Sequence, residues 1–240
     1  MTIITSSGSS LADRDYYLRT FTDLLYDAVY LLYFAFDINQ EDYKDDVIHP
    51  HIRGSALSSL LLLECGANCL LDSLDLPDKF YSDLDRLPIL SKFEYYLSTL
   101  NVDSKFDRGC KEIQAISELK QIRNAYVHPK VKKTKLIPFE ENMWAHDFQE
   151  SKLLKIPRDP RIWKKEHAIT ILKAINDFFN KYFLELCQLN CNQVVDLLMS
   201  NERVDIAQAN GAYIDCVGGL DRAVKEWKID FKFLGKIVSN

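Results

Sequence analysis

SALSSLLLLECGANCLLDSLDL, residues 55–76, is the stretch that decides the fold of this chain. Its four consecutive leucines, residues 60–63, place apolar side chains on every face of a helix, because successive residues of an α-helix point about 100° apart. A helix that is apolar all round is stable only where other elements surround it. The sequence therefore predicts a central helix that lies in the middle of a bundle and ends before Pro77.

Four further segments show the apolar spacing of one helix face turned toward a core. The chain has only 8 glycines and 7 prolines in 240 residues, which favours helices over a turn-dense β architecture. The predicted fold class is therefore all-α, a helical bundle. The four segments are Leu11–Phe36, Ile89–Leu100, Cys110–Val127 and Lys165–Gln188.

The composition along the chain predicts a bundle over residues 1–190 and a small appendage over residues 191–240. Residues 136–164 contain three prolines and no sustained period, so they are predicted to form a long ordered loop before the last bundle helix, with room for one short helix. In the appendage, a short helix is expected over 192–201 and a helical turn or two over 220–228. Asn210-Gly211, between alternating apolar residues, predicts a β-hairpin.

Charge, hydropathy and cysteine usage indicate a cytoplasmic protein. The longest apolar run, Ala28–Phe36, is far shorter than the roughly 20 residues of a membrane-spanning helix, and residues 1–10 lack the features of a signal peptide. The 6 cysteines lie in apolar helical surroundings, which suits reduced thiols. A net charge of -5 argues against a surface that binds nucleic acid throughout, but leaves room for a local basic patch.

The segment SELKQIRNAYVHPK, residues 117–130, carries the candidate chemistry. Arg123 keeps its positive charge at all relevant pH values, and His128 titrates near neutrality. Cleavage of RNA without a metal needs proton transfer to and from the reacting oxygens and stabilisation of a highly charged phosphorane. Arg123 and His128 supply both kinds of group, so this segment is predicted to be catalytic.

A helical bundle whose penultimate core helix ends in Arg-Asn-x-x-x-His resembles the HEPN superfamily, whose ribonuclease members share this order of residues at similar spacing. The resemblance covers roughly residues 11–190. It implies a homodimer that brings two motifs together in one cleft, and catalysis with no metal and no cofactor. By the same resemblance, His128 is the acid or base, Arg123 is the phosphate clamp, and Asn124 orients His128.

Helix geometry separates the members of this motif. Asn124 and His128 are four residues apart and share a face, whereas Arg123 and His128 point about 140° apart. Arg123 must therefore curl around the helix end or serve the histidine of a second protomer. Four lysines near the motif are predicted to contact RNA phosphates; the alternative is that they only complement the negative end of the helix dipole. They are Lys120, Lys130, Lys132 and Lys133.

The sequence thus predicts a metal-independent endoribonuclease that acts on RNA by attack of the ribose 2′-hydroxyl and leaves a 2′,3′-cyclic phosphate. A role as a toxin or as a defence factor fits this chemistry, and a toxin role leaves room for an inhibitory partner protein. No membrane partner is expected. The alternative is a non-catalytic helical module that binds a partner protein or a nucleotide.

Other candidate sites have simpler explanations. Arg161 and His167, with five residues between them instead of four, also fall within the family's spacing, but Ile162 follows the arginine and the pair begins a helix. His49 and His51 form half of a metal site at most. Cysteines four residues apart on two helices could form a four-thiolate zinc site if those helices meet, but core packing is the favoured explanation. These are Cys65, Cys69, Cys187 and Cys191.

Overall fold

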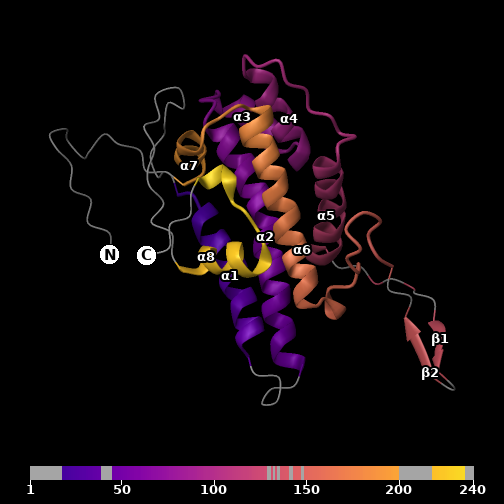
Figure 1. Ribbon diagram of the computed structural model, residues 1–240. Helices are drawn as coiled ribbons and strands as arrows, with labels where there is room; N and C mark the ends of the chain where they lie inside the picture. Colours follow the sequence, from indigo (N-terminus) through magenta and orange to yellow (C-terminus); the bar gives the residue numbers. More distant parts are fainter. Residues whose placement is uncertain are drawn as a thin grey trace.

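The computed structural model describes residues 18–38, 45–128, 131, 133, 136–140, 143–146, 149–199 and 218–235. The protein is an all-α bundle, as predicted, built around the long helix α2 (Asp45–Asp72). Figure 1 shows α2 in the middle, with other helices on several sides of it. Helices α1 (Phe21–Asp37), α4 (Ile89–Thr99), α5 (Lys111–Val127) and α6 (Lys165–Phe179) all contact α2.

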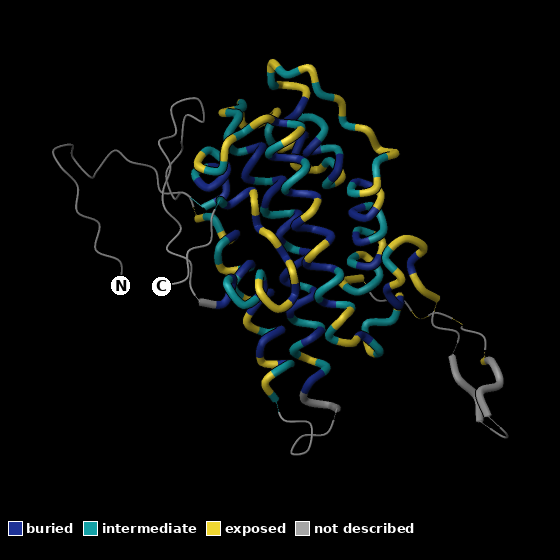
Figure 2. The backbone as a smooth tube through the Cα atoms, in the orientation of Figure 1, coloured by how far each residue is buried: buried dark blue, intermediate teal, exposed yellow. Residues whose placement is uncertain are grey.

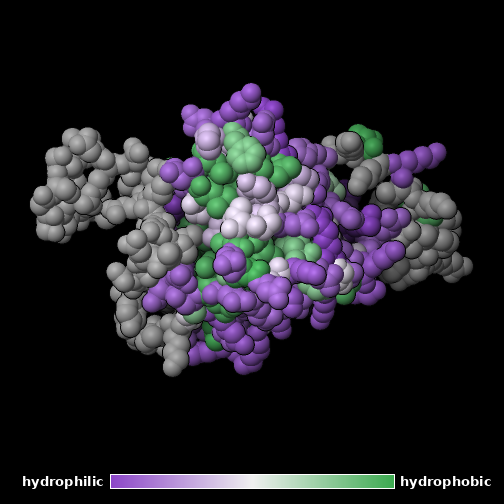
Figure 3. Space-filling view, turned by 90° about the horizontal axis from the view of Figure 1, so that it is seen from above, coloured by the Kyte–Doolittle hydropathy of each residue, from purple (hydrophilic) through white to green (hydrophobic). Residues whose placement is uncertain are grey.

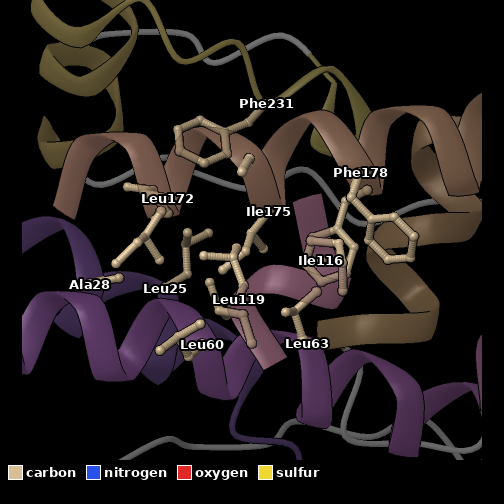
Figure 4. Packing of buried hydrophobic residues seen from close by; sticks show 14 of the residues in the cluster. Leu25, Ala28, Leu60, Leu63, Ile116, Leu119, Leu172, Ile175, Phe178 and Phe231 are labelled. Carbon is tan, nitrogen blue, oxygen red and sulfur yellow. The ribbon is translucent and has the colours of Figure 1, made fainter. Parts of the chain in front are cut away.

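The core is continuous across these helices. Figure 4 shows Leu119 of α5 and Ile175 of α6 pointing toward Leu60 of α2, and all three side chains are at most 1% exposed. In Figure 2 the buried residues run along the inner faces of the helices, with exposed residues at the outer faces and loops. The four leucines 60–63 behave largely as predicted, because Leu60, Leu62 and Leu63 are buried and Leu61 is half-buried.

One helix of the described residues is long and apolar enough to cross a membrane, by length and composition alone. It spans Ile48–Asp72 and has a mean hydropathy of 1.4 over its most apolar stretch. Of that stretch, 67% is buried against the rest of the protein, which is the pattern of a core helix.

Two helix starts differ from the prediction. Residues 18–20 are not helical, and α1 begins at Phe21, with Thr20 as its N-cap residue. The Arg19 side chain forms an ion pair with Asp72 at 3.0 Å. Helix α2 begins at Asp45, ten residues before the predicted start, and it contains Pro50. Pro50 is the sixth residue of α2, beyond the first turn, so it removes one backbone hydrogen bond and crowds the preceding turn. The burial of Ile48 and Ile52 on either side of it offsets this cost.

Short elements connect the bundle. Helix α3 (Asp78–Asp85), which the sequence did not predict, follows Pro77 and carries one buried residue, Leu84. The predicted loop over 136–164 contains an antiparallel hairpin, β1 (Leu136–Glu140) and β2 (Met143–His146), as well as a short 3-10 helix, η2 (Pro160–Ile162). The prediction missed the hairpin because Pro138 interrupts the strand signal: proline cannot donate a hydrogen bond within a sheet.

The described C-terminal elements belong to the same core as the bundle. Helix α6 continues into the wider π-type turns of η3 (Asn180–Leu186), and these are followed by α7 (Cys191–Met199), α8 (Gly218–Trp227) and η5 (Lys232–Leu234). The predicted boundary at residue 190 therefore does not coincide with a break in the packing. The predicted hairpin around Asn210-Gly211 lies outside the described residues. The C-terminal members of the core are Val194, Val195, Leu197, Leu198, Leu220, Ala223, Trp227, Ile229, Phe231, Phe233 and Leu234.

Candidate functional site

Arg123 lies near the end of α5, just before its last turn, and is held against α2. Its Nη2 forms an ion pair with Oε2 of Glu64, and its Nη1 donates a hydrogen bond of 3.3 Å to Oδ1 of Asn124. Its Nε is buried and has no hydrogen-bond partner among the described residues. The side chain of Arg123 is 21% exposed, so the guanidinium reaches solvent only at its edge. The pairing with Glu64 fixes the direction in which Arg123 points.

His128 is the first residue beyond α5. Its backbone N–H donates a hydrogen bond of 3.1 Å to the carbonyl of Asn124, and its φ of -121° and ψ of 65° lie outside helical geometry. The residue is exposed. Within the described part of the chain, the imidazole forms no hydrogen bond or ion pair.

The structure does not bring Arg123 and His128 of one chain together. Among the described residues, no hydrogen bond or ion pair joins the two side chains. Arg123 points toward Glu64 of α2, while Asn124 and His128 are exposed. This separation follows from the helix, since five residues correspond to a rotation of about 140°.

Only two of the four predicted phosphate-binding lysines can be placed. Lys120 is half-buried on α5, one turn before Asn124, and Lys133 is exposed. Lys130 and Lys132 lie outside the described residues. Lys120 therefore shares a side of α5 with Asn124, because residues four apart on a helix are neighbours.

Glu118 of α5, which sequence reasoning did not single out, fastens the following loop to the helix. Its carboxylate accepts hydrogen bonds from the backbone N–H groups of Leu153, at 2.8 and 3.0 Å, and Leu154, at 3.1 Å. Burial raises the pKa of Glu118, but these N–H groups and the Ser151 hydroxyl lower it by more, so the pKa lies below its ordinary value.

Replacing Glu118 with glutamine is expected to lower the free energy of unfolding by about 1 kcal/mol at neutral pH, because the variant loses charge-assisted hydrogen bonds on a partly exposed side chain. The lowered pKa sets the pH dependence. The stabilisation is complete above the ordinary carboxyl range, near pH 4.3, and is lost as the pH falls through the lower folded pKa. Urea unfolding of both proteins from about pH 7 to about pH 3 measures this, and a difference that stays constant with pH contradicts it.

The cysteine and histidine alternatives do not assemble into a metal site. Among the described residues, no group of three or more His, Cys, Asp or Glu side chains could hold a metal ion. Cys65 lies 3.7 Å from the Thr20 hydroxyl, and Cys191 donates a hydrogen bond of 3.1 Å to the carbonyl of Lys232. Burial raises the pKa of Cys187 to about 12, as expected of a thiol in a core.

The second Arg-to-His spacing has a structural role. Arg161 pairs with Asp159 on the surface, at 2.6 Å. His167 accepts a hydrogen bond of 2.9 Å at its Nδ1 from the backbone N–H of Lys164, which caps the start of α6. Burial lowers the pKa of His167, so the neutral ring that accepts this bond is favoured.

No protein-family model, curated protein or solved structure matches the chain.

Proposed function

We propose that this protein is a metal-independent endoribonuclease of the HEPN type that works as a homodimer in the cytoplasm. The observation that supports this most directly is the placement of the motif on a core helix. Arg123 stands just before the last turn of α5 and is paired with Glu64, and His128 follows the helix at an exposed position. A guanidinium and an exposed imidazole are the kinds of group that suit metal-free RNA cleavage.

The reaction is an attack of the ribose 2′-oxygen on the neighbouring phosphorus. A base takes the proton of the 2′-hydroxyl, the bond from the 2′-oxygen to phosphorus forms, and the bond from phosphorus to the 5′-oxygen breaks. An acid then gives a proton to the leaving 5′-oxygen. His128 suits either proton transfer, and Arg123 suits the extra negative charge of the phosphorane, which a planar guanidinium can meet with two hydrogen bonds.

The fixed direction of Arg123 is the reason for proposing a dimer. One chain pairs Arg123 with Glu64 of α2 and leaves His128 exposed, so a site in which one protomer contributes Arg123 and the other contributes His128 requires no rearrangement of Arg123. Two copies of α5 that face each other would give two such composite sites. The biological role that fits is that of a toxin or defence factor acting on cellular or invading RNA.

A second candidate function is supported by the same ion pair. Because Glu64 already engages Arg123, the pair also suits a purely structural clamp between α5 and α2. The bundle would then be a non-catalytic module that binds a partner protein or a nucleotide.

The deciding experiment incubates the purified protein with end-labelled RNA in EDTA. We expect cleavage with a 2′,3′-cyclic phosphate at the new 3′ end, and no cleavage of DNA of the same sequence, because DNA lacks the nucleophilic hydroxyl. Intact RNA after prolonged incubation, or equal cutting of DNA, would favour the binding module.

A further inference from the structure

A pocket of about 450 Å³ lies between α5 and the loop that follows β2, and its walls come from both. The helix contributes Gln121, Ile122 and Ala125, and the loop contributes Ser151, Lys152 and Arg158. Its volume falls within the roughly 300–1,000 Å³ of small-molecule sites in proteins. Figure 3 shows that the upper face of the molecule is largely hydrophilic on the side where Figure 1 places α5. Five of the seven residues that line the pocket are polar or charged, so a polar ligand suits it.

The wall that the loop provides is fixed in place. Glu118, which also lines the pocket, binds the backbone of Leu153 and Leu154, as described above. Ser151 donates its backbone N–H to the carbonyl of Ile156 at 2.8 Å, and its hydroxyl accepts the N–H of Ile156 at 3.1 Å. The pocket is therefore formed before any ligand arrives, and the charge of Glu118 is shared with backbone N–H groups.

The cations of the lining favour an anion, and its apolar residues favour a ligand with a flat, partly apolar body. Lys152 and Arg158 are both exposed, and neither makes an ion pair among the described residues. Ile122 and Ala125 supply an apolar floor, and the Gln121 amide can both donate and accept hydrogen bonds. A nucleotide offers a match for each of these: a charged phosphate, the flat ring of its base, and hydrogen-bonding groups on the edge of that ring.

The position of the pocket connects it with the motif. Gln121, Ala125 and His128 are spaced by four and three residues, so they follow one side of α5. His128 lies about 4.5 Å beyond Ala125 along the helix axis, by the rise of an α-helix. Arg123 points away from this side, toward Glu64. Lys152 and Arg158 therefore supply positive charge on the side of His128 that Arg123 of the same chain does not reach.

We infer that this pocket binds one nucleotide of a single-stranded RNA, next to the phosphate that His128 meets. Ile122 and Ala125 support the base, Gln121 reads its edge, and Lys152 and Arg158 hold the phosphates. The inference rests on the proposed function for its choice of RNA. It makes the pocket the part of the site that selects which nucleotide stands beside the cleaved bond.

The test measures the binding of a short fluorescent 2′-O-methyl RNA, which lacks the nucleophile and stays intact. The variant K152Q/R158Q removes both pocket cations. The matched control K155Q/R161Q removes the same charges from the same loop at residues outside the pocket lining. We expect the pocket variant to bind about 10-fold more weakly. The plot of its log affinity against log salt concentration should have a slope shallower by about 0.7 for each phosphate that the variant no longer neutralises. The control should stay within about twofold of the unchanged protein, because it keeps both pocket cations.

Recognition of the base is tested by a separate measurement. Gln121→Ala is expected to change the order of affinity among A, C, G and U homopolymers of the same 2′-O-methyl backbone, which a merely electrostatic surface would not do. The inference is overturned if the unchanged protein does not bind these RNAs, or if both double variants lose affinity equally. It is also overturned if polyglutamate competes as well as RNA does, since the pocket would then suit acidic peptides.

The outcomes separate this inference from the proposed function. Pocket-dependent binding of the uncleavable RNA, together with intact natural RNA in EDTA, would support the pocket and contradict the nuclease. Cleavage of natural RNA with the same KM in K152Q/R158Q as in the unchanged protein would support the nuclease and contradict the pocket.

Discussion

Replacing His128 with alanine is expected to slow RNA cleavage by about 10²–10⁴-fold, the usual contribution of a positioned proton-transfer group. The residue is exposed, and its side chain makes no described contact, so the free energy of unfolding should change by less than about 0.5 kcal/mol. Single-turnover cleavage rates in EDTA, with urea unfolding of the same preparation, measure both effects. His167→Ala is the control, because His167 follows an arginine at similar spacing but caps α6.

Arg123→Ala should slow cleavage to a similar extent through loss of phosphate binding, and a mixture of the two variants tests the dimer. If Arg123 of one protomer serves His128 of the other, mixing His128→Ala with Arg123→Ala creates mixed dimers with one intact composite site, and part of the activity returns. If the two residues act within one chain, the mixture stays inactive. Equal rates for the unchanged protein and the His128→Ala variant would remove the nuclease proposal altogether.

Replacing Phe179 with alanine is expected to lower the free energy of unfolding by about 3–5 kcal/mol, the range for a fully buried phenylalanine. Phe179 is 1% exposed, and its ring lies 5.8 Å from that of Phe21 in α1 and 5.3 Å from that of Phe233 in η5. Gly66 of α2 approaches it so closely that an added Cβ there would lie 3.3 Å from the ring. One side chain thus joins the N-terminal, central and C-terminal parts of the bundle.

The comparison for Phe179 is Phe80→Ala in α3. Phe80 is 45% exposed, so the same change of atoms should cost less than about 1 kcal/mol. Urea unfolding followed by far-ultraviolet circular dichroism gives both values. Similar losses for the two variants would contradict the packing described for α6 and for the C-terminal segment.

The helices that carry a strong periodic pattern could be predicted from the sequence. The predicted Cys110–Val127 and Ile89–Leu100 differ from α5 and α4 by one residue each. The start of α2 could not be predicted in the same way, because a proline such as Pro50 normally marks the boundary of a helix. Here tertiary packing stabilises the helix on both sides of it. Helix α3 was not predicted because its eight residues are too few for the apolar residues to show a helical period.

The candidate site was predictable only in part. The residue types and spacing of Arg123, Asn124 and His128 single them out in the sequence, and helix geometry predicts their separation. The partner of Arg123 could not be found in this way, because Glu64 lies 59 residues earlier and meets it only through the packing of α5 on α2. The same holds for Glu118, whose partners are backbone groups of a loop without a sequence signature.

The widened turns of η3 make the number of residues in this segment as important as their identity. Tyr182 donates a hydrogen bond of 2.7 Å to the carbonyl of Phe93 in α4, while its neighbour Phe183 stacks toward Phe233 in η5. The N–H of Cys187 reaches back five residues, to the carbonyl of Tyr182, where an ordinary helix reaches back four. Deleting one residue from the helix without a compensating change in its winding would rotate all that follows by about 100°. Insertions and deletions at this point are therefore less tolerable than exchanges of one apolar side chain for another.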